Sequence, residues 1–391
     1  MKAIVLAAGE GVRNRPLTLG RPKPMLPVGN RPILEHVLAS LHVAEVHDVT
    51  LVVGYKGETI QAHFQDGQHY GVRIGYARQP KPAGSIDSFV RGLGVTGTKD
   101  DVLIVPGDNY LGRDVLKRFL AAAGDRDALL YTTSDDPKRY GVVELNDDFV
   151  ACIREKPQVA AQRTISTGIV RLSGTRAAGA KRHLARPETG LTDFYNDLAK
   201  AKPRLVGVPL EGPWFDVDRP ENLLGANALE LGSIEADVSG NVEPGANVVG
   251  PVRIGKGSRI LSGTYLVGPV VIGEGCEVGP HTVVYGPTAI GDNVTVGPFT
   301  ELLECVVMND VRVASGCTLH HAVLDRGVVL APKVQIDKAH GVAGADFGAV
   351  VGDGTVLGNA VSLEPGSIVG AEVRVAPHKR VGHVPTGARV V

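Results

Sequence analysis

The second half of this chain is dominated by aliphatic residues that recur at every sixth position. The run is Val242, Val248, Ile254, Ile260, Leu266, Ile272, Val278, Val284, Ile290, Val296, Leu302 and Met308. A period of six matches neither a helix nor an alternating strand; it indicates a hexapeptide repeat, in which short strands and tight corners coil into a parallel β-helix. We therefore predict that each recurring aliphatic points into the prism, and that Gly, Asn and Pro form the corners.

The phase of the repeat changes after Met308. Leu324, Leu330 and Ile336 share one frame. A later set shares another: Val351, Leu357, Leu363, Val369, Val375 and Val381. We expect each change of frame to be a loop or bulge extruded from a coil, and Lys338 to Ala349 is the favoured position.

The first 230 or so residues follow a different pattern, in which β-rich runs alternate with helical stretches. The expected strands are Lys2–Ala8, Val49–Val53, Val72–Tyr76, Val102–Val105, Ala128–Thr132 and Ile165–Leu172. Helices are expected at Ile33–His42, Asp114–Ala123 and Glu221–Leu231. This alternation predicts an α/β, Rossmann-like domain with a mainly parallel sheet covered by helices. Ligands bind such sheets at the carboxyl ends of the strands.

Length and composition bound the organisation of the chain. Its 391 residues are enough for two domains, which we place at 1–230 and 242–391, with 231–241 as a linker. Lys plus Arg (41) and Asp plus Glu (42) nearly cancel, so no basic field attracts nucleic acid. The four cysteines form no CxxC pair, which fits reduced thiols in a cytoplasmic protein. The apolar run Ala3–Ala8 is too short for a signal segment or a membrane span.

A glycine-rich loop follows the first expected strand. Gly9-Glu10-Gly11 has the outline of a phosphate cradle, because glycines let backbone N–H groups approach anionic oxygens. A dehydrogenase is disfavoured, since Asn14 stands where the dinucleotide fingerprint needs its third glycine. The nearest approach to a Walker A loop, Gly250–Gly257, lies inside the hexapeptide repeat and lacks the Lys-Ser/Thr ending. What remains is a proline-stiffened loop with four cations that suit a polyphosphate: Arg13, Arg15, Arg21 and Lys23.

The segment LAAGEGVRNRPLTLGRPKPMLPVGNRPILEHV resembles the signature of the sugar-1-phosphate nucleotidyltransferases, which make nucleotide sugars. The likeness continues in order through Gln79, Gly84-Ser85, Gly107-Asp108, Tyr140-Gly141, Glu155-Lys156-Pro157, Thr167-Gly168 and Trp214-Phe215-Asp216. The repeat region is similar to the left-handed β-helix of archaeal-type and bifunctional members, the N-acetylglucosamine-1-phosphate uridyltransferases and the long glucose-1-phosphate thymidylyltransferases. Val12, Ser85 and Val170 depart from the family's usual residues.

The resemblance implies that a sugar-1-phosphate attacks the α-phosphorus of a nucleoside triphosphate, giving a UDP- or dTDP-sugar and pyrophosphate. Arg13 and Lys23 would then be the catalytic cations that grip the triphosphate. Nucleotide binding would fall to Ala8, Gly9, Gly11, Gln79, Gly84 and Ser85. Sugar-phosphate binding would fall to Gly141, Glu155, Lys156 and Thr167. The base stays open, because Thr167-Gly168 favours thymidylyltransferases and Asp216 to Pro220 favours the archaeal uridylyl type.

Two carboxylates are candidates for holding Mg²⁺. Asp108 follows the apolar run Val102–Val105 and so lies at the carboxyl end of a strand, where we also expect Asp216, after Trp214. Mg²⁺ commonly takes one or two carboxylates and leaves its other positions to water and phosphate oxygens. The family likeness assigns both aspartates to the metal.

The β-helix is also a candidate for a second activity. Bifunctional relatives transfer an acetyl group from acetyl-CoA to an amino-sugar phosphate there, and His320 and His321 are the candidate general bases. Ala331-Pro332 departs from the Ala-Asn of archaeal relatives, however, and such domains also serve for assembly alone. The β-helix resembles those that pack three to an axis, so we expect a homotrimer or a multiple of it.

A non-catalytic regulatory paralogue is the remaining alternative. Such a chain is expected to have lost the cationic loop or a metal carboxylate. This one retains Arg13, Lys23, Asp108 and Asp216. The sequence therefore favours an enzyme with a nucleoside triphosphate and a sugar-1-phosphate as partners, and neither nucleic acid nor a membrane.

Overall fold

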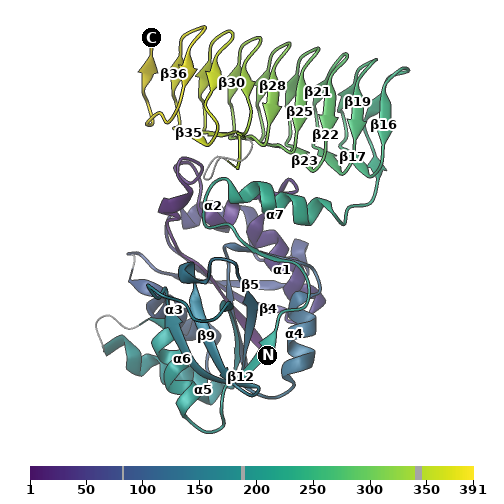
Figure 1. Cartoon of the computed structure of the whole chain (residues 1–391). Helices are drawn as coiled ribbons and strands as arrows, with labels where there is room; N and C mark the ends of the chain where they lie inside the picture. Colours follow the sequence, from purple (N-terminus) through teal and green to yellow (C-terminus); the bar gives the residue numbers. More distant parts are fainter. Residues whose placement is uncertain (82, 186–189, 340–345) are drawn as a thin grey trace. The chain divides into compact units, whose positions relative to one another are not determined.

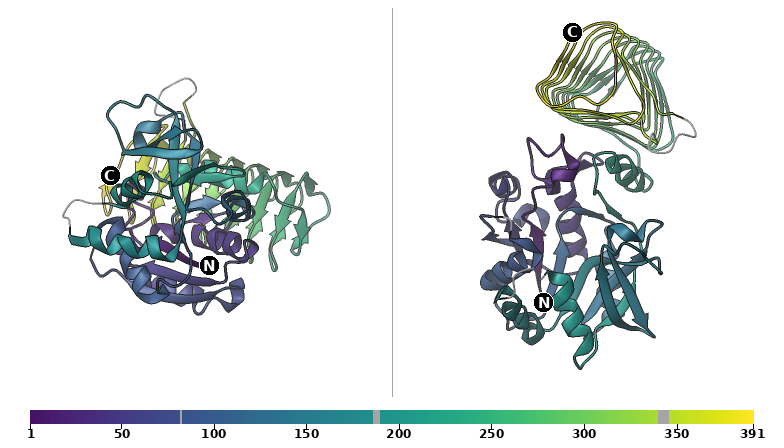
Figure 2. Two further views of the ribbon diagram at one scale, coloured as in Figure 1. Left: turned by 90° about the horizontal axis from the view of Figure 1, so that it is seen from below. Right: turned by 60° about the vertical axis from the view of Figure 1, so that its left-hand side comes forward.

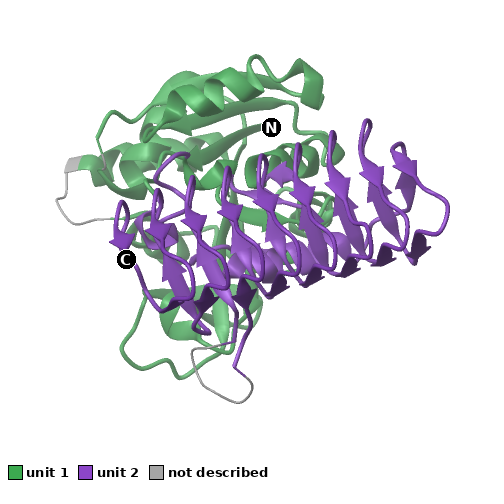
Figure 3. Ribbon diagram, turned by 90° about the horizontal axis from the view of Figure 1, so that it is seen from above, with its two compact units in different colours: residues 1–10, 22–25, 33–214 green, residues 11–21, 26–32, 215–391 purple. Residues whose placement is uncertain are grey.

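Figure 1 shows the computed structural model of the chain, in which residues 1–81, 83–185, 190–339 and 346–391 are described. These residues form two compact units that alternate along the sequence (Figure 3). Unit 1 comprises Met1–Glu10, Pro22–Met25 and Ile33–Trp214. Unit 2 comprises Gly11–Arg21, Leu26–Pro32 and Phe215–Val391. The cationic loop is thus divided, with Lys23 in unit 1 and Arg13 in unit 2.

Within the described ranges, nine strands of unit 1 form one sheet. Their spatial order is β5 (Arg73–Arg78), β4 (Asp48–Val53), β1 (Lys2–Ala7), β6 (Val102–Pro106), β11 (Thr164–Leu172), β8 (Ala128–Thr133), β12 (Val206–Pro209), β10 (Phe149–Glu155) and β9 (Gly141–Asn146). Strands β5, β4, β1 and β6 run parallel, as does the pair β8 and β12. Strand β11 is antiparallel to β6 and β8, and β10 is antiparallel to β12 and β9. The α/β class is confirmed, with antiparallel strands beyond β6.

Helices cover both faces of this sheet. One hydrophobic core contains buried residues of α1 (Ile33–Val43), α2 (Gly57–Phe64) and α4 (Val115–Ala123). The other contains residues of α3 (Gly84–Thr96), α5 (Gly174–Ala178) and α6 (Leu191–Lys200). The predicted stripe of α1, with Ile33, Val37 and Leu41, is completely buried, as its helical spacing requires. The short elements are η1 (Val12–Asn14), η2 (Lys23–Met25), η3 (Gln68–Tyr70), η4 (Pro137–Arg139), η5 (Gly179–Ala185), β2 (Pro27–Val28), β3 (Arg31–Pro32), β7 (Asn109–Leu111) and β13 (Trp214–Asp216).

Unit 2 continues through α7 (Asn222–Leu231) into a parallel β-helix with three faces, seen nearly end-on in the right-hand view of Figure 2. Each face is a ladder of short parallel strands. One runs from β14 (Asp237–Val238) to β35 (Ser367–Val369), the second from β15 (Asn241–Val242) to β38 (Arg389–Val390), and the third from β16 (Asn247–Val249) to β37 (Arg380–Val381). The hexapeptide repeat thus produces the predicted architecture.

The register of the coils confirms that the recurring aliphatics from Ile254 to Leu302 stack inside the prism, whereas Val248, in the first coil, is 37% exposed. Ile254 pairs with Ile272 and Ile272 pairs with Ile290, and all three are at most 1% exposed. The corners stack as tightly: a Cβ on Gly255 would lie 2.5 Å from the carbonyl oxygen of Gly273. Glycine is required at such a corner because no side chain fits between successive coils.

The first change of frame comes one repeat earlier than predicted. Val307, and not Met308, pairs with Ile290. The corner before it, at Glu304, is one residue shorter than the corners of earlier coils and is not extruded. Glu304 adopts a positive φ of 52°, and His321 repeats this at 50° in the next coil. The pattern misled because Met308 is apolar and buried as well.

The later change of frame is an insertion at the predicted place. Strand β31 (Gln335–Ile336) ends a coil, and the next strand, β32 (Ala349–Val351), lies on the neighbouring face. Of the segment between them, residues 340–345 lie outside the described residues. The helix prediction for α7 is also confirmed, since Asn222–Leu231 falls within the expected range.

Candidate active site

The residues that follow four neighbouring strands of unit 1 meet at one edge of its sheet. The N–H of Gln79, after β5, donates to Val53 O of β4 at 2.8 Å. Ala8 O, after β1, accepts from Tyr55 N at 3.3 Å, and Gly107 N, after β6, donates to Leu6 O at 2.9 Å. This is the carboxyl edge of the parallel strands, where ligands of such sheets bind.

Lys23 and Asp108 form the central ion pair of this edge. Lys23 Nζ lies 2.9 Å from Asp108 Oδ2. The Lys23 side chain is 9% exposed and that of Asp108 is 39% exposed. The ammonium is therefore held in place by a carboxylate that still reaches solvent. A fixed cation beside an accessible carboxylate can bind a phosphate group and a divalent ion together.

The two glycines of the predicted cradle, Gly9 and Gly11, have different roles in the backbone. In unit 1, a Cβ on Gly9 would meet nothing within 4 Å. In unit 2, Gly11 has a φ of 65° and precedes η1, and its carbonyl oxygen accepts a hydrogen bond from Thr18 Oγ1 at 2.8 Å. The left-handed conformation of Gly11 is one that side chains rarely adopt, which accounts for glycine at this turn.

Arg13 lies against the segment that contains Asp216. Arg13 Nη1 is 2.6 Å from Asp218 Oδ1, and the Asp218 side chain is only 8% exposed. Asn14 Nδ2 donates to Val217 O at 3.0 Å. Within unit 2, Arg13 thus pairs with Asp218, which is two positions after the predicted metal ligand Asp216. Sequence reasoning missed Asp218, although its place next to the matched Trp-Phe-Asp segment could have suggested it.

Gln79, the predicted base reader, is buried, and its side chain bonds within the protein. Its amide Nε2 donates to Gly84 O at 3.1 Å and to Asp87 Oδ2 at 2.9 Å. Its Oε1 accepts from Ser88 Oγ at 2.8 Å. Partial burial alone would raise the pKa of Asp87, but hydrogen bonds from Arg91 and Gln79 lower it below its ordinary value. These contacts fix the first turn of α3, which begins at Gly84.

The predicted sugar residues converge on the start of α6. Glu155 Oε2 accepts a hydrogen bond from Thr192 Oγ1 at 3.0 Å. A Cβ on Gly141 would lie 3.2 Å from that same Glu155 oxygen, so glycine at this position leaves the carboxylate more room. Lys156 Nζ is 3.8 Å from Glu155 Oε1. The contribution of α6 was not predicted, because its first turn, with Thr192, matches no named motif.

Two further predicted residues, Ser85 and Thr167, make hydrogen bonds within the protein. Ser85 Oγ accepts from Leu191 N at 3.2 Å, so it also faces the start of α6. Thr167 is 3% exposed and donates from Oγ1 to Leu130 O at 2.7 Å. Its hydroxyl is therefore engaged within the sheet, and its contribution to a sugar pocket stays a prediction.

Arg21 has a partner that the sequence did not suggest. Arg21 Nη2 lies 2.6 Å from Asp325 Oδ1 in the β-helix. The Arg21 side chain is 17% exposed, whereas that of Arg13 is 61% exposed. Of these two arginines of the expected polyphosphate cluster, only Arg13 is open to solvent.

The number and the exposure of the carboxylates decide whether these residues fit Mg²⁺. Within the described ranges, no group of three or more His, Cys, Asp or Glu side chains is arranged to enclose a metal ion. Mg²⁺ does not require such a cage, since it keeps several waters and binds through one or two carboxylates and substrate phosphates. The accessible Asp108 carboxylate suits that mode of binding. Asp216 ends β13 in unit 2, and its place as a second ligand stays a prediction.

The two histidines of the β-helix each face carboxylates. His321 Nδ1 is 3.1 Å from Glu304 Oε2. His320 Nδ1 is 3.2 Å from Asp337 Oδ1, and its Nε2 is 3.4 Å from Glu301 Oε1. Burial lowers the pKa of His321, an effect that the Glu304 carboxylate opposes. A neutral imidazole oriented by a carboxylate is the arrangement of a general base.

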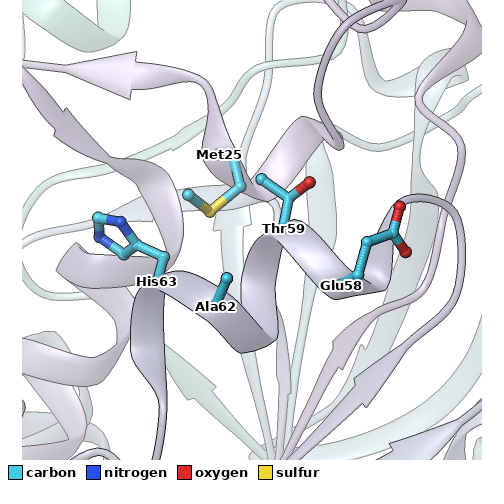
Figure 4. A pocket seen from close by; sticks show the side chains of 5 residues that line it. All are labelled: Met25, Glu58, Thr59, Ala62 and His63. Carbon is cyan, nitrogen blue, oxygen red and sulfur yellow. The ribbon is translucent and has the colours of Figure 1, made fainter.

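A surface hollow of about 650 Å³ lies beside α2 (Figure 4). Its lining residues are Met25, Glu58, Thr59, Ala62 and His63. Met25 ends η2, the short turn that begins with Lys23. The predicted site residues do not line this hollow, so it is distinct from the Lys23–Asp108 pair.

Comparison with known families decides the classification of the chain. The family model described as "Nucleotidyl transferase" matches residues 2–232. The chain belongs to the nucleotidyl transferase family. A second model, described as "GMPPB C-terminal domain", matches residues 266–390, within the β-helix.

Two curated relatives of the chain have different names. The bifunctional protein GlmU of Methanococcus maripaludis is 33% identical over 66% of this chain and 62% of its own length. The glucose-1-phosphate thymidylyltransferase of Streptomyces griseus is 30% identical over 66% of this chain and 74% of its own length. The aligned region therefore spans less than two thirds of the archaeal relative.

A solved structure has a similar fold. It is a putative glucose-1-phosphate thymidylyltransferase from Bacillus anthracis in complex with a sucrose, with a TM-score of 0.54 and 28% identity. The alignment covers 59% of this chain and 94% of that one. Within the described ranges, none of the helices is both long enough and apolar enough to traverse a bilayer.

Proposed function

We propose that the chain joins a nucleoside triphosphate to a sugar-1-phosphate, giving a nucleotide sugar and pyrophosphate in a Mg²⁺-dependent reaction. The observation that carries this proposal is the Lys23–Asp108 pair at the carboxyl edge of β1 and β6. It provides a cation for phosphate and a carboxylate for a metal at one place. Membership of the nucleotidyl transferase family supports the same reaction class.

The chemistry requires two polyanions to be held together. An oxygen of the sugar-1-phosphate attacks the α-phosphorus, and the bond from that phosphorus to the β-phosphate oxygen breaks in line. Lys23 would bind the triphosphate and stabilise the charge that develops on the departing pyrophosphate. Arg13 would add a bidentate contact, and the N–H groups near Gly9 and Gly11 would line the phosphates.

Separate sets of residues would hold the metal and the sugar. Asp108 and Asp216 would hold Mg²⁺, which when bound neutralises phosphate charge and orients the reacting groups. Glu155 would accept hydrogen bonds from sugar hydroxyls, since its carboxylate is half-exposed beside Gly141. Lys156 would reach the phosphate of the sugar. Because the Gln79 side chain already forms hydrogen bonds within the protein, it would shape the base pocket by fixing Gly84.

A matrix of substrates tests the proposal. The full chain is assayed for pyrophosphate release with the common nucleoside triphosphates against several sugar-1-phosphates, with and without Mg²⁺. We expect release with UTP or dTTP that requires both the sugar-1-phosphate and the metal. No release from any combination would instead support the regulatory paralogue.

Acetyl transfer from acetyl-CoA to an amino-sugar phosphate is a second candidate activity. The observation that favours it is the contact of His321 with Glu304 in the β-helix, next to the inserted segment after β31. The name of the archaeal relative, a bifunctional protein, is consistent with this activity. A thiol-release assay with acetyl-CoA and glucosamine-1-phosphate is expected to detect it. Equal rates in the parent and in His321→Asn would contradict the assignment.

Assembly as a homotrimer or a multiple of it also remains our proposal. It is supported by the continuous three-faced β-helix, whose third face carries exposed apolar residues in neighbouring coils. Val249, Tyr265 and Tyr285 are 47%, 40% and 38% exposed on that face. Light scattering at the monomer mass would reject it.

A further inference from the structure

We infer that Arg21 is a positioning residue whose ion pair with Asp325 anchors the loop Gly11–Arg21 on the β-helix and so holds Arg13 in place. We call Gly11–Arg21 the triphosphate loop. The inference rests on the proposed nucleotidyl transfer, because the loop belongs to that same site. It makes the β-helix part of the apparatus that orients the triphosphate.

The anchor is a buried and specific contact. Asp325 is 1% exposed, and its Oδ1 accepts from Arg21 Nη2 at 2.6 Å and from Arg326 N at 2.7 Å. Arg21 Nη1 lies 2.7 Å from Met308 Sδ. The guanidinium thus spans the residues that follow two stacked strands, β26 (Val306–Val307) and β29 (Val323–Leu324). A flexible surface arginine would not be enclosed in this way.

The opposite half of the triphosphate loop is fixed to the segment after β13. Arg13 pairs with Asp218, and Asn14, which is 2% exposed, donates to Val217 O. The loop therefore bridges the segment of the predicted metal ligand and the wall of the β-helix. All of these contacts lie within unit 2.

A second segment makes parallel attachments. Asn30 Nδ2 donates to Ile290 O at 2.6 Å, in the coil before Met308. Gly29 N donates to Asn227 Oδ1 of α7 at 3.1 Å, and Arg31 pairs with Glu230 of the same helix. The two segments Gly11–Arg21 and Leu26–Pro32 are thus both attached to α7 or the β-helix within unit 2.

The electrostatics of Asp325 explain why the pair acts as a unit. Burial raises the pKa of Asp325, and the Arg21 charge opposes that shift. A buried carboxylate without its cation is unfavourable, and a guanidinium without its carboxylate is free to reorient. Removing either partner is therefore expected to release the loop, and removing both should do little more.

The test compares four variants of the full chain: Arg21→Ala, Asp325→Asn, the double variant, and the control Arg259→Ala. Arg259 lies on an exposed face of the β-helix, where it pairs with Glu243 and Glu277. The readouts are kcat and KM for the triphosphate, and amide hydrogen exchange of residues 11–20. We expect each single variant to lower kcat/KM by about 10- to 100-fold and to speed loop exchange. The kcat/KM of the double variant should be no lower than that of the more impaired single variant.

Every outcome bears on the inference. Additive losses, or a normal Asp325→Asn beside an impaired Arg21→Ala, would show that Arg21 contacts the triphosphate directly and would overturn it. Unchanged loop exchange in both single variants would overturn it as well. If the parent releases no pyrophosphate, the proposed function is contradicted but the inference is not. Hydrogen exchange of residues 11–20 then still tests whether the Arg21–Asp325 pair holds the loop. If Arg21→Ala does not fold, Arg21→Lys replaces it, with intermediate loop exchange expected.

Discussion

Lys23 Nζ contacts Asp108 Oδ2 at 2.9 Å, although the two residues are 85 positions apart in the chain. The contact joins the loop after β1 to the turn after β6, two strands that are neighbours in the sheet. The carboxylate holds the ammonium in place, so little reorganisation would be needed when a phosphate binds. Two predictions test the roles of these residues separately.

Replacing Lys23 should remove the main charge that stabilises the leaving pyrophosphate. We expect Lys23→Ala to lower kcat by about 10²- to 10³-fold, in the range found when one preorganised transition-state contact is lost. Steady-state pyrophosphate release measures the effect. Lys117→Ala, on the exposed side of α4, is the matched control and should retain the parent rate. A Lys23→Ala variant within twofold of the parent would exclude Lys23 from catalysis.

Replacing Asp108 should weaken metal binding while preserving the shape of the side chain. Asp108→Asn is expected to raise the Mg²⁺ concentration for half-maximal activity by at least about tenfold. The measurement is a Mg²⁺ titration at saturating substrates. Asp114→Asn serves as the control, because Asp114 is exposed and only pairs with Arg118 along a helix. Superimposable titrations for Asp108→Asn and the parent would reject Asp108 as a ligand.

The β-helix offers a test of which aliphatics fill its interior. Leu302 is completely buried, whereas the next residue, Leu303, faces outward. We expect Leu302→Ala to lower the free energy of unfolding by about 2–5 kcal/mol, and Leu303→Ala by about 0.5 kcal/mol. Urea titrations followed by circular dichroism give both values. Equal losses would mean that the assigned register is wrong.

His321 should make stability depend on pH. Its folded pKa is lowered from the ordinary value of 6.5, first by burial and against the opposing effect of Glu304. As the pH falls below about 6.5, the unfolded chain therefore binds a proton that the folded chain resists, and the folded state loses stability. The midpoint of thermal unfolding should fall more between pH 7 and pH 5 for the parent than for His321→Asn.

The control for this pH series is His69→Asn, at an exposed histidine of unit 1. It should follow the parent curve throughout. Asparagine suits position 321 because it tolerates the positive φ found there. Parallel curves for the parent and His321→Asn would show that His321 does not titrate differently on folding.

The β-helix was the more predictable part of the fold. Each coil contacts only its neighbours, so one inward aliphatic in every six residues is enough to specify the ladder through Ile254, Ile272 and Ile290. The shortened corner at Glu304 was not predictable, since it only exchanges one buried apolar residue for the next. In unit 1 the strands β9, β10 and β12 were missed, because their pairing depends on distant partners rather than on a local period.

The candidate site was predictable in its residue types and less so in its contacts. Lys23 and Asp108 were both singled out from the sequence, because one lies on the cationic loop, the other follows a strand, and the family resemblance includes both. The partners Asp218 and Asp325 were not, because a lone aspartate carries no periodic signal and Asp325 is 304 positions from Arg21. Such long-range ion pairs are determined by the tertiary fold, which the local pattern does not encode.

The most direct measurement follows the oxygens of the reaction. The parent chain is supplied with Mg²⁺, a triphosphate and a sugar-1-phosphate whose non-bridging phosphate oxygens carry ¹⁸O, and the products are examined by ³¹P NMR. We predict that one labelled oxygen becomes the bridge between the two phosphorus atoms of the nucleotide sugar, and that the pyrophosphate is unlabelled. Label in the pyrophosphate, or release of pyrophosphate without a nucleotide sugar, would contradict attack on the α-phosphorus.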